Sequence, residues 1–389
     1  MLFNSPDLTD DELRVLGDLD HFRIRLRHVL HEPRRWKGVL RRNLKARAIQ
    51  GSNSIEGYDV SLDDALALLD GDEPMDADRR TSLEIVGYRN AMTYIQQLAD
   101  DPHALLDASL LRSLHFMMLG HDLRNSPGQY RRGPTYVRDD DRAVTVYEGP
   151  DADLVPGLMS ELTCSLTEPD DAPVFVRAAM AHLNLVMIHP FRDGNGRMAR
   201  ALQTLVLARE RVLAPEFSSI EEWLGRNTNR YYDVLADVGA GAWHPERDTR
   251  EWLRFTLVAH HVQAQTVLRR VEEASRLWQE LSEIAESRRL PERTLTALFD
   301  AASGLRVRRS GYQRDAEVEP GTAARDLRMM VAAGLLSPSG ETRARRYSAT
   351  PGLKAVRDRV AAGRPTIVDP FGHPPDRRTA ARNVTTASE

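Results

Sequence analysis

The sequence predicts an all-α protein that carries one small β-hairpin and ends in a separate helix–helix–hairpin unit. Apolar residues recur at the three- and four-residue spacing of amphipathic helices over about the first 280 residues. In that part, the segment GPTYVRDDDRAVTVYEGP has two alternating stretches around an Asp-Asp-Asp turn, which predicts a hairpin. After about residue 285, two helix patterns precede an Arg-rich strand pair, the order found in a winged helix-turn-helix.

The individual helices are predicted from apolar stripes. The two strongest stripes lie over residues 174–187 and 197–213. Further helices are expected over residues 81–99, 108–119, 153–166, 220–238, 249–281, 291–303 and 319–336. The basic run 34–47 repeats Trp36, Leu40 and Leu44 every fourth residue, which favours a helix packed on the core over a solvated face.

Length and composition indicate a globular chain with more than one structural unit. A chain of 389 residues exceeds the usual size of one hydrophobic core. The net charge of −4 argues against a generally basic nucleic-acid coat but allows a local basic patch. The single cysteine, Cys164, excludes an intramolecular disulfide and a multi-cysteine zinc site.

The sequence shows neither a secretion signal nor a membrane span. The N-terminal stretch is polar and acidic, without a positive region that leads into an apolar one. No run approaches the eighteen or so apolar residues that a transmembrane helix needs. We therefore expect a cytoplasmic protein without a membrane partner.

A short loop, IHPFRDGNGRMAR, separates the two strongest helices. Pro190 disfavours continued helix, and Gly194 and Gly196 allow backbone conformations that side chains forbid. A tight loop that opens into a helix presents free N–H groups and the positive end of the helix dipole, which suits phosphate. Arg197 and Arg200 share one face of the new helix and can neutralise further phosphate oxygens.

The other residues of this loop supply groups for chemistry. Asp193 is a hard oxygen ligand of the kind that Mg²⁺ takes beside phosphates. Asn195 is expected to donate to a phosphate oxygen, and Phe191 to anchor the loop in the core. His189 titrates near neutrality and can accept a proton from an attacking hydroxyl. Each residue alone has an ordinary structural explanation, but their ordered combination predicts a phosphate-transfer site.

The segment HPFRDGNGRMAR resembles the Fic motif, His-Pro-Phe-x-Asp/Glu-Gly-Asn-Gly-Arg-x-x-Arg, at every specified position. The resemblance covers roughly residues 30–350 and includes PGQYRRGPTYV, which is similar to the family's approach to a substrate-docking flap. It also includes SIEEWLGRNTNRYYDVL, which is similar to a helix whose tyrosines line the nucleotide base pocket. The resemblance implies a helical Fic fold with a hairpin flap.

The activity that this resemblance implies is AMP transfer from ATP to a Ser, Thr or Tyr hydroxyl of a target protein and of the protein itself. His189 would be the general base, and Asp193 would hold Mg²⁺, or Mn²⁺ in its place. The implied ATP- and phosphate-binding residues are Phe191, Asp193, Gly194, Asn195, Gly196, Arg197 and Arg200. Related enzymes that phosphorylate carry Lys where this chain has Arg197, whereas relatives that use UTP or CDP-choline are not separated by the motif.

The resemblance also implies two binding surfaces. Thr135, Tyr136, Val137 and Arg138 would form the flap, which pairs with an extended segment of the target by strand addition. Tyr231 and Tyr232 would flank the adenine pocket. Some members carry Asn seven residues beyond the second tyrosine, where this chain has Gly239.

A second motif precedes this core, in the stretch SNSIEGY. Ser52, Glu56 and Gly57 match the family's inhibitory motif, Ser/Thr-x-x-x-Glu-Gly/Asn, at the N-terminal location of class II members. The four-residue spacing places Ser52 and Glu56 on one helical face. Glu56 is expected to pair with Arg200, which denies that guanidinium to the γ-phosphate.

Two other functions stay open at this point, and a homodimer is compatible with the sequence. One is a DNA-binding regulator that uses basic residues of the winged helix: Arg325, Arg328, Arg343, Arg345 and Arg346. Four nearby acids offset these arginines and favour a protein-interaction module instead: Asp315, Glu317, Glu319 and Asp326. The other is an enzyme that mainly removes AMP, with Glu56 placing the attacking water.

The predicted organisation has five parts. They are an N-terminal helical region with the inhibitory helix (1–70), a Fic catalytic core (71–260), a helical connector (261–285), the winged helix-turn-helix (286–352) and a C-terminal extension (353–389). The extension is rich in Pro, Arg and Thr, a composition typical of partly disordered tails.

Overall fold

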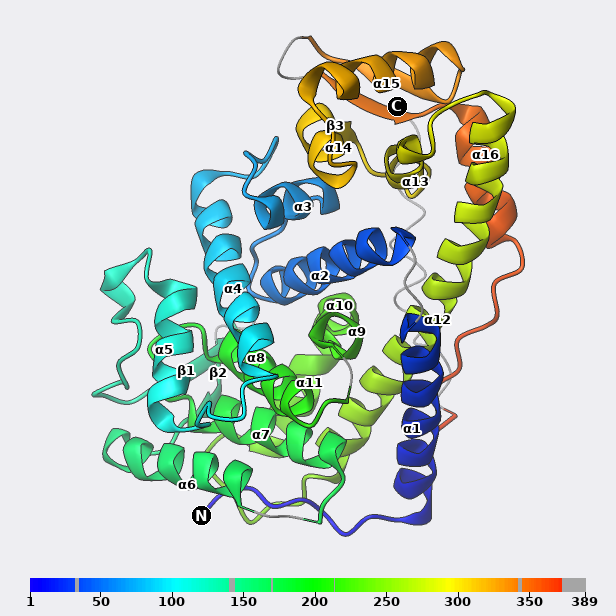
Figure 1. Ribbon diagram of the computed structural model, residues 1–389. Coiled ribbons are helices and arrows are strands. Elements are labelled where there is room, and N and C mark those ends of the chain that lie inside the picture. The colour runs from blue at the N-terminus through cyan, green and yellow to red at the C-terminus, as the bar shows by residue number, and fades with distance from the viewer. Residues whose placement is uncertain (32–34, 140–143, 169–170, 213, 342–344, 373–389) are drawn as a thin grey trace.

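The computed structural model describes residues 1–31, 35–139, 144–168, 171–212, 214–341 and 345–372, and it is mainly helical (Figure 1). The predicted helical fold with a small hairpin is confirmed. None of the helices in the described part of the chain combines the length and apolar surface needed to cross a lipid bilayer.

The main body contains the elements from α1 to α12. Its first helices are α1 (Asp10–His31), α2 (Arg35–Ile55), α3 (Leu62–Asp70), α4 (Arg79–Leu98) and α5 (Ala108–Leu119). The hairpin strands β1 (Tyr136–Asp139) and β2 (Val144–Glu148) follow the short helix η1 (Leu123–Asn125). The remaining elements are η2 (Ala152–Leu154), α6 (Val155–Thr167), α7 (Val174–Ile188), α8 (Asn195–Arg209), α9 (Pro215–Ser218), α10 (Glu221–Arg226), α11 (Thr228–Gly239) and α12 (Arg250–Ser287).

The centre of the main body is the pair α7 and α8, the two helices with the strongest apolar stripes. Both are buried around most of their circumference, as expected for α7, which is apolar on several faces. α8 also buries polar side chains, among them Arg197, Arg200 and Gln203. The surrounding helices α4, α5, α6 and α12 pack their apolar stripes onto this pair. The loop that joins α7 to α8 therefore starts and ends on the most deeply buried elements of the protein.

The hairpin lies beside this loop. β1 and β2 are antiparallel, Tyr136 is opposite Glu148, and the register shifts between Val137 and Arg138. The predicted flap, residues 135–138, thus begins one residue before β1. The buried Tyr147 donates a hydrogen bond from its hydroxyl to the Met187 carbonyl at 2.8 Å, which attaches β2 to α7.

The C-terminal unit comprises residues 290–361. Its elements are η3 (Glu292–Thr294), α13 (Leu295–Ala302), β3 (Val307–Arg308), α14 (Arg309–Asp315), α15 (Pro320–Ala332), β4 (Leu336–Ser339), β5 (Arg346–Ala349) and α16 (Pro351–Ala361). The sheet is antiparallel in the order β3-β5-β4. This order of helices and strands is compatible with the predicted winged helix-turn-helix, which remains a prediction.

The C-terminal unit differs from the sequence prediction in three places. The strand pair expected within 341–350 is formed instead by β4 and β5, and residues 342–344, which include Arg343, lie outside the described residues. β3 and α14 were not predicted, because both are too short to show a hydrophobic period. The predicted extension begins inside α16, whose Leu353, Val356 and Val360 are buried in the unit's core. The extension is described as far as residue 372, and residues 373–389 lie outside the described residues.

Two helices run through the cores of both parts (Figure 1). The first half of α2 buries Trp36, Leu40 and Leu44 with the C-terminal unit, as the basic run predicted, and its second half buries Ile49 and Ile55 in the main body. The first half of α12 packs in the main body, and its second half packs with the C-terminal unit. α12 continues unbroken across the predicted boundary between residues 260 and 261.

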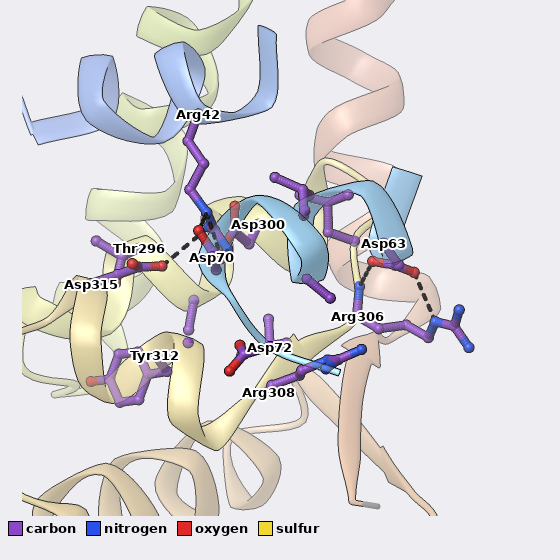
Figure 2. Close-up of a pocket in the computed structure, with 16 residues that line it drawn as sticks. Arg42, Asp63, Asp70, Asp72, Thr296, Asp300, Arg306, Arg308, Tyr312 and Asp315 are labelled. Carbon is purple, nitrogen blue, oxygen red and sulfur yellow. Dashed lines mark hydrogen bonds and ion pairs between the residues drawn. The ribbon is translucent and has the colours of Figure 1, made fainter. Parts of the chain in front are cut away.

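A polar pocket lies where the C-terminal unit meets α2 and α3. Figure 2 shows Arg42 extending from α2 toward carboxylates from three other elements. Its guanidinium forms a short ion pair with Asp70 and longer ones with Asp315 at 3.2 Å and Asp300 at 3.5 Å. Burial, with the nearby Asp315 and Asp70, raises the pKa of Asp300 to about 7 in spite of Arg42.

This junction predicts a pH-dependent stability. The pKa of Asp300 is higher in the folded chain than the value of about 3.9 expected when unfolded. The folded state therefore holds this proton more tightly, and the free energy of unfolding falls as pH rises from about 4 through 7. We expect Asp300→Asn, relative to wild type, to gain about 2–3 kcal/mol of unfolding free energy between pH 5 and pH 8. Urea unfolding at both pH values measures this change. The exposed Glu73→Gln is the control, and an Asp300→Asn variant that follows wild type throughout would contradict the prediction.

Candidate active site

The loop between α7 and α8 begins with an unusual backbone conformation. His189 follows the last residue of α7 and has φ 50°, in the left-handed region, and its N–H donates to the Leu185 carbonyl at 3.1 Å. A non-glycine residue in this region costs on the order of 1 kcal/mol or more and persists only when its surroundings hold it. Pro190 comes next and ends the helix.

The side chain of Asn195 closes the loop. Its Oδ1 accepts from the Phe191 N–H at 2.9 Å, and its Nδ2 donates to the Phe191 carbonyl at 2.9 Å. Asn195 is buried, and these bonds use its Oδ1 and one of the two N–H groups of Nδ2. Its donation to a phosphate oxygen stays a prediction. Asn195 fixes the shape of the loop at the start of α8.

Phe191 anchors the loop, as predicted, and packs on a histidine that the sequence did not single out. Its ring stacks on His115 of α5 with centroids 3.7 Å apart. His115 accepts from the Gly128 N–H with Nδ1, so it is Nε2 that carries the proton and donates to the Asp193 carbonyl at 2.9 Å. Burial lowers the pKa of His115 to about 4, so it is neutral at physiological pH.

The imidazole of His189 is held through one of its nitrogens. Its Nδ1 lies 3.1 Å from the Val186 carbonyl, an atom that can only accept. Nδ1 therefore carries the proton in the neutral ring, and Nε2 keeps a free lone pair. Burial lowers the pKa of His189 below its ordinary value, so this neutral form dominates at pH 7.

The predicted contact between Glu56 and Arg200 is present. Arg200 is 2% exposed, and its Nη2 donates to Glu56 Oε1 at 2.7 Å. Ser52 accepts from the same guanidinium twice, with its hydroxyl at 2.8 Å and with its carbonyl at 3.0 Å. A Cβ on Gly196 would lie 2.7 Å from Glu56 Oε1, so the carboxylate lies directly against the first turn of α8. Glu56 thus occupies the predicted anion site.

Arg197 pairs with a carboxylate of α4. Its Nη1 donates to Glu84 in a buried ion pair, and its guanidinium lies 5.5 Å from the centre of the Tyr58 ring. Glu84 also lies 3.2 Å from His121 Nε2. The charge of Arg197 is therefore compensated by a carboxylate that the sequence did not single out, and its binding to phosphate stays a prediction.

Asp193 is the group best placed to hold a cation. Its carboxylate is 40% exposed, accepts from the Gly194 N–H at 2.6 Å and from Asn125 Nδ2 at 3.2 Å, and lies 3.9 Å from Arg197. Among the described residues, no cluster of three or more His, Cys, Asp or Glu side chains could hold a metal alone. A single accessible carboxylate fits Mg²⁺ that arrives with phosphate oxygens, because that ion commonly takes one or two carboxylates and otherwise phosphates and water.

The two tyrosines predicted to flank an adenine pocket have different surroundings. Tyr231 is buried, and its hydroxyl lies 2.9 Å from His182 Nε2, so it belongs to the core. Tyr232 is 44% exposed and donates to the Ile55 carbonyl at 3.2 Å, directly before Glu56. A Cβ on Gly239 would lie 2.9 Å from the Tyr147 ring, which explains why a larger residue is not accommodated there.

The fold and site together define a helical domain in which a histidine closes the loop that leads to the N-terminus of a buried helix. A family model described as Fic/DOC family matches residues 105–207. Protein adenylyltransferase Fic of Drosophila yakuba is 32% identical over 258 residues, which are 64% of this chain and 46% of the relative. Protein adenylyltransferase fic-1 of Caenorhabditis briggsae is 27% identical over 206 residues, 51% of this chain and 39% of the relative. The chain thus spans less than half the length of these relatives.

Two solved structures have the same fold. A Fic family protein from Desulfovibrio desulfuricans covers 90% of this chain and 99% of its own, with a TM-score of 0.58 and 21% identity. A Fic-1 fragment from Caenorhabditis elegans covers 66% of this chain and 72% of its own, with a TM-score of 0.54 and 22% identity. Residues 105–207 are therefore similar to the Fic/DOC family.

The internal bonds of the loop predict a stability effect at Asn195. Asn195→Ala would leave the buried N–H and carbonyl of Phe191 without these partners, so we expect a loss of about 2–4 kcal/mol in unfolding free energy. Denaturant unfolding followed by circular dichroism measures it. Asn90→Ala, at an exposed position of α4, should change the free energy by less than about 0.5 kcal/mol. Equal stability of the two variants would show that the loop does not depend on this side chain.

Proposed function

We propose that this protein transfers AMP from ATP to a Ser, Thr or Tyr hydroxyl of a target protein and of itself. The observation that carries the proposal is the free Nε2 of His189 beside the phosphate-binding start of α8. The relatives named protein adenylyltransferase support the same chemistry at about 30% identity over half to two thirds of this chain.

In the proposed reaction, His189 Nε2 takes the proton from the target hydroxyl. The hydroxyl oxygen then forms a bond to the α-phosphorus of ATP, and the bond from that phosphorus to the pyrophosphate oxygen breaks. The lowered pKa of His189 keeps the base unprotonated at neutral pH. The first-turn N–H groups of α8 have no intrahelical acceptors and can bind the phosphates.

Asp193 would hold Mg²⁺ in this reaction, since its carboxylate is exposed at the start of the phosphate site. When bound, the ion supplies positive charge to the phosphate oxygens. Arg200 would contribute further charge to the distal phosphates once Glu56 has left it. Its Nη1 has no hydrogen-bond partner among the residues that the structure describes.

The hairpin would present the target. β1 pairs with β2 along one edge, so its other edge can add an extended strand of the target through backbone hydrogen bonds. Tyr136 is 52% exposed on this strand. Tyr232 is the tyrosine we assign to the adenine site, because it remains accessible whereas Tyr231 is in the core.

In the present arrangement, Glu56 would inhibit the reaction. Its carboxylate takes up the Arg200 Nη2 donor and lies against Gly196, where phosphate oxygens would otherwise bind. Tyr232 holds the backbone one residue before Glu56, so the adenine site and the inhibitory segment share a side chain. Nucleotide binding in a productive position therefore requires Glu56 to move.

Substitution of Glu56 tests both the reaction and its inhibition. We expect Glu56→Gly to raise AMP transfer to the protein itself at least about tenfold, because the anion site and Arg200 become free. His189→Ala in the same background should abolish transfer. Mass spectrometry with ATP and Mg²⁺ detects the added AMP, and Asp59→Gly, which removes a neighbouring exposed acid, is the control. Absence of transfer from Glu56→Gly to itself and to lysate proteins would refute the proposed function.

DNA binding by the C-terminal unit is a second candidate, and the structure changes the charge balance that argued against it. Asp326 is fully buried and pairs with Arg293 and Tyr312, and Asp315 lies against Arg42 in the junction. Of the four acids that offset the basic residues, these two therefore point inward. Arg325 and Arg328 are exposed on α15.

This candidate predicts salt-dependent binding to duplex DNA. Changing both Arg325 and Arg328 to Gln should weaken binding and reduce the slope of log affinity against log salt by roughly two, since each phosphate contact contributes about 0.9. Fluorescence anisotropy between 50 and 200 mM salt measures the slope, with the exposed Arg309→Gln as control. Binding that is absent, or equal in all variants, would exclude α15 as a DNA-binding surface.

A further inference from the structure

Arg131 connects the hairpin to the loop that carries His189. Its Nε donates to the His189 carbonyl at 2.8 Å, and its Nη1 donates to the Gly133 carbonyl at 2.8 Å. Its Nη2 donates to the Pro150 carbonyl and, at 3.4 Å, to the Ile188 carbonyl. Gly133 precedes β1 and Pro150 follows β2, so one side chain joins both ends of the hairpin to the end of α7.

The main chain of the same residue adds a further bond. The Arg131 N–H donates to the Pro190 carbonyl at 2.9 Å. Three consecutive carbonyls, from Ile188 to Pro190, are thereby bound by one residue, around the left-handed backbone of His189. These bonds help to hold the left-handed backbone of His189, the residue proposed as the base.

The chemistry of these contacts suits arginine alone. Among the described residues, every hydrogen bond of this guanidinium goes to a backbone carbonyl. A planar guanidinium has five N–H donors in a fixed geometry and can serve several carbonyls together, whereas a lysine ammonium directs three donors from one point. Burial lowers the pKa of Arg131, but an arginine remains charged at neutral pH. The charge and its donors are therefore used within the protein and not on phosphate.

We propose that Arg131 is the positioning residue that sets the distance between the hairpin and His189. The inference rests on the proposed function, in which the hairpin holds the target and His189 takes its proton. A target bound to β1 reaches Nε2 only if the hairpin is held at a fixed place relative to the α7–α8 loop. Tyr147 attaches the middle of β2 to Met187, and Arg131 attaches the two ends.

The test compares Arg131→Lys with the Glu56→Gly parent, and uses Arg132→Lys at the exposed neighbouring position as control. Three quantities are measured: hydrogen exchange of the amides over residues 144–149, ATP affinity, and the single-turnover rate of AMP transfer. We expect about tenfold faster exchange in the hairpin and ATP affinity within about threefold of the parent. The transfer rate should fall about 100-fold, since misplacement by about 1 Å costs on that order.

A second variant disturbs the contacts of Arg131 with the hairpin without replacing the arginine. A Cβ on Gly149 would lie 2.6 Å from Thr135 Cγ2 and 3.3 Å from Arg131 Nη2, so Gly149→Ala must displace the hairpin's base. We expect the same pattern as for Arg131→Lys, namely a lower transfer rate with ATP affinity retained. This variant provides the test if the lysine variant does not fold.

The outcomes separate the two proposals. Unchanged exchange in Arg131→Lys overturns the inference, and so does faster exchange with an unchanged transfer rate. A loss of transfer matched by an equal loss of ATP affinity indicates general damage and also overturns it. If the Glu56→Gly parent transfers no AMP, the proposed function fails. Faster hydrogen exchange of the hairpin in Arg131→Lys would still support the inference that Arg131 holds the hairpin against the α7–α8 loop.

Discussion

The rest of the site depends on the burial of one guanidinium at the start of a helix. Arg200 is almost fully buried one turn into α8, where the positive end of the helix dipole already disfavours another cation. A buried charge of this kind costs several kcal/mol unless it is paired. Ser52 and Glu56 supply the pairing, and they require α2 to pass directly over the loop. The anion that stabilises the buried guanidinium is therefore also the group that we propose to block the phosphate site.

The loop itself owes its shape to contacts that involve no nucleotide. Asn195 fixes Phe191, Phe191 stacks on His115, and His115 binds the Asp193 carbonyl. These residues come from α5 and from both ends of the loop, and their polar atoms are satisfied within the protein. The backbone that would receive phosphate is thus formed before any ligand arrives, which is the condition for effective electrostatic stabilisation of a reaction.

Contacts encoded by short-range patterns could be predicted, and those that depend on packing could not. The pairing of Glu56 with Arg200 follows from two linear motifs, each with its helical spacing. The internal role of Asn195 was missed because the motif gives the residue type but not the partner of its amide. Glu84 and Arg131 were missed because each lies in a separate segment, α4 and the approach to the hairpin. In the C-terminal unit, β3 has only two residues, which is too few for any period to appear.

The course of α2 and α12 has a mechanical consequence. α12 alone has 38 residues, or about 57 Å of continuous helix. The two helices run in different directions (Figure 1), and each packs in the cores of both parts, so together they oppose bending of one part against the other. Because Glu56 directly follows α2, the place of this helix between the two parts also fixes the place of the carboxylate beside Arg200.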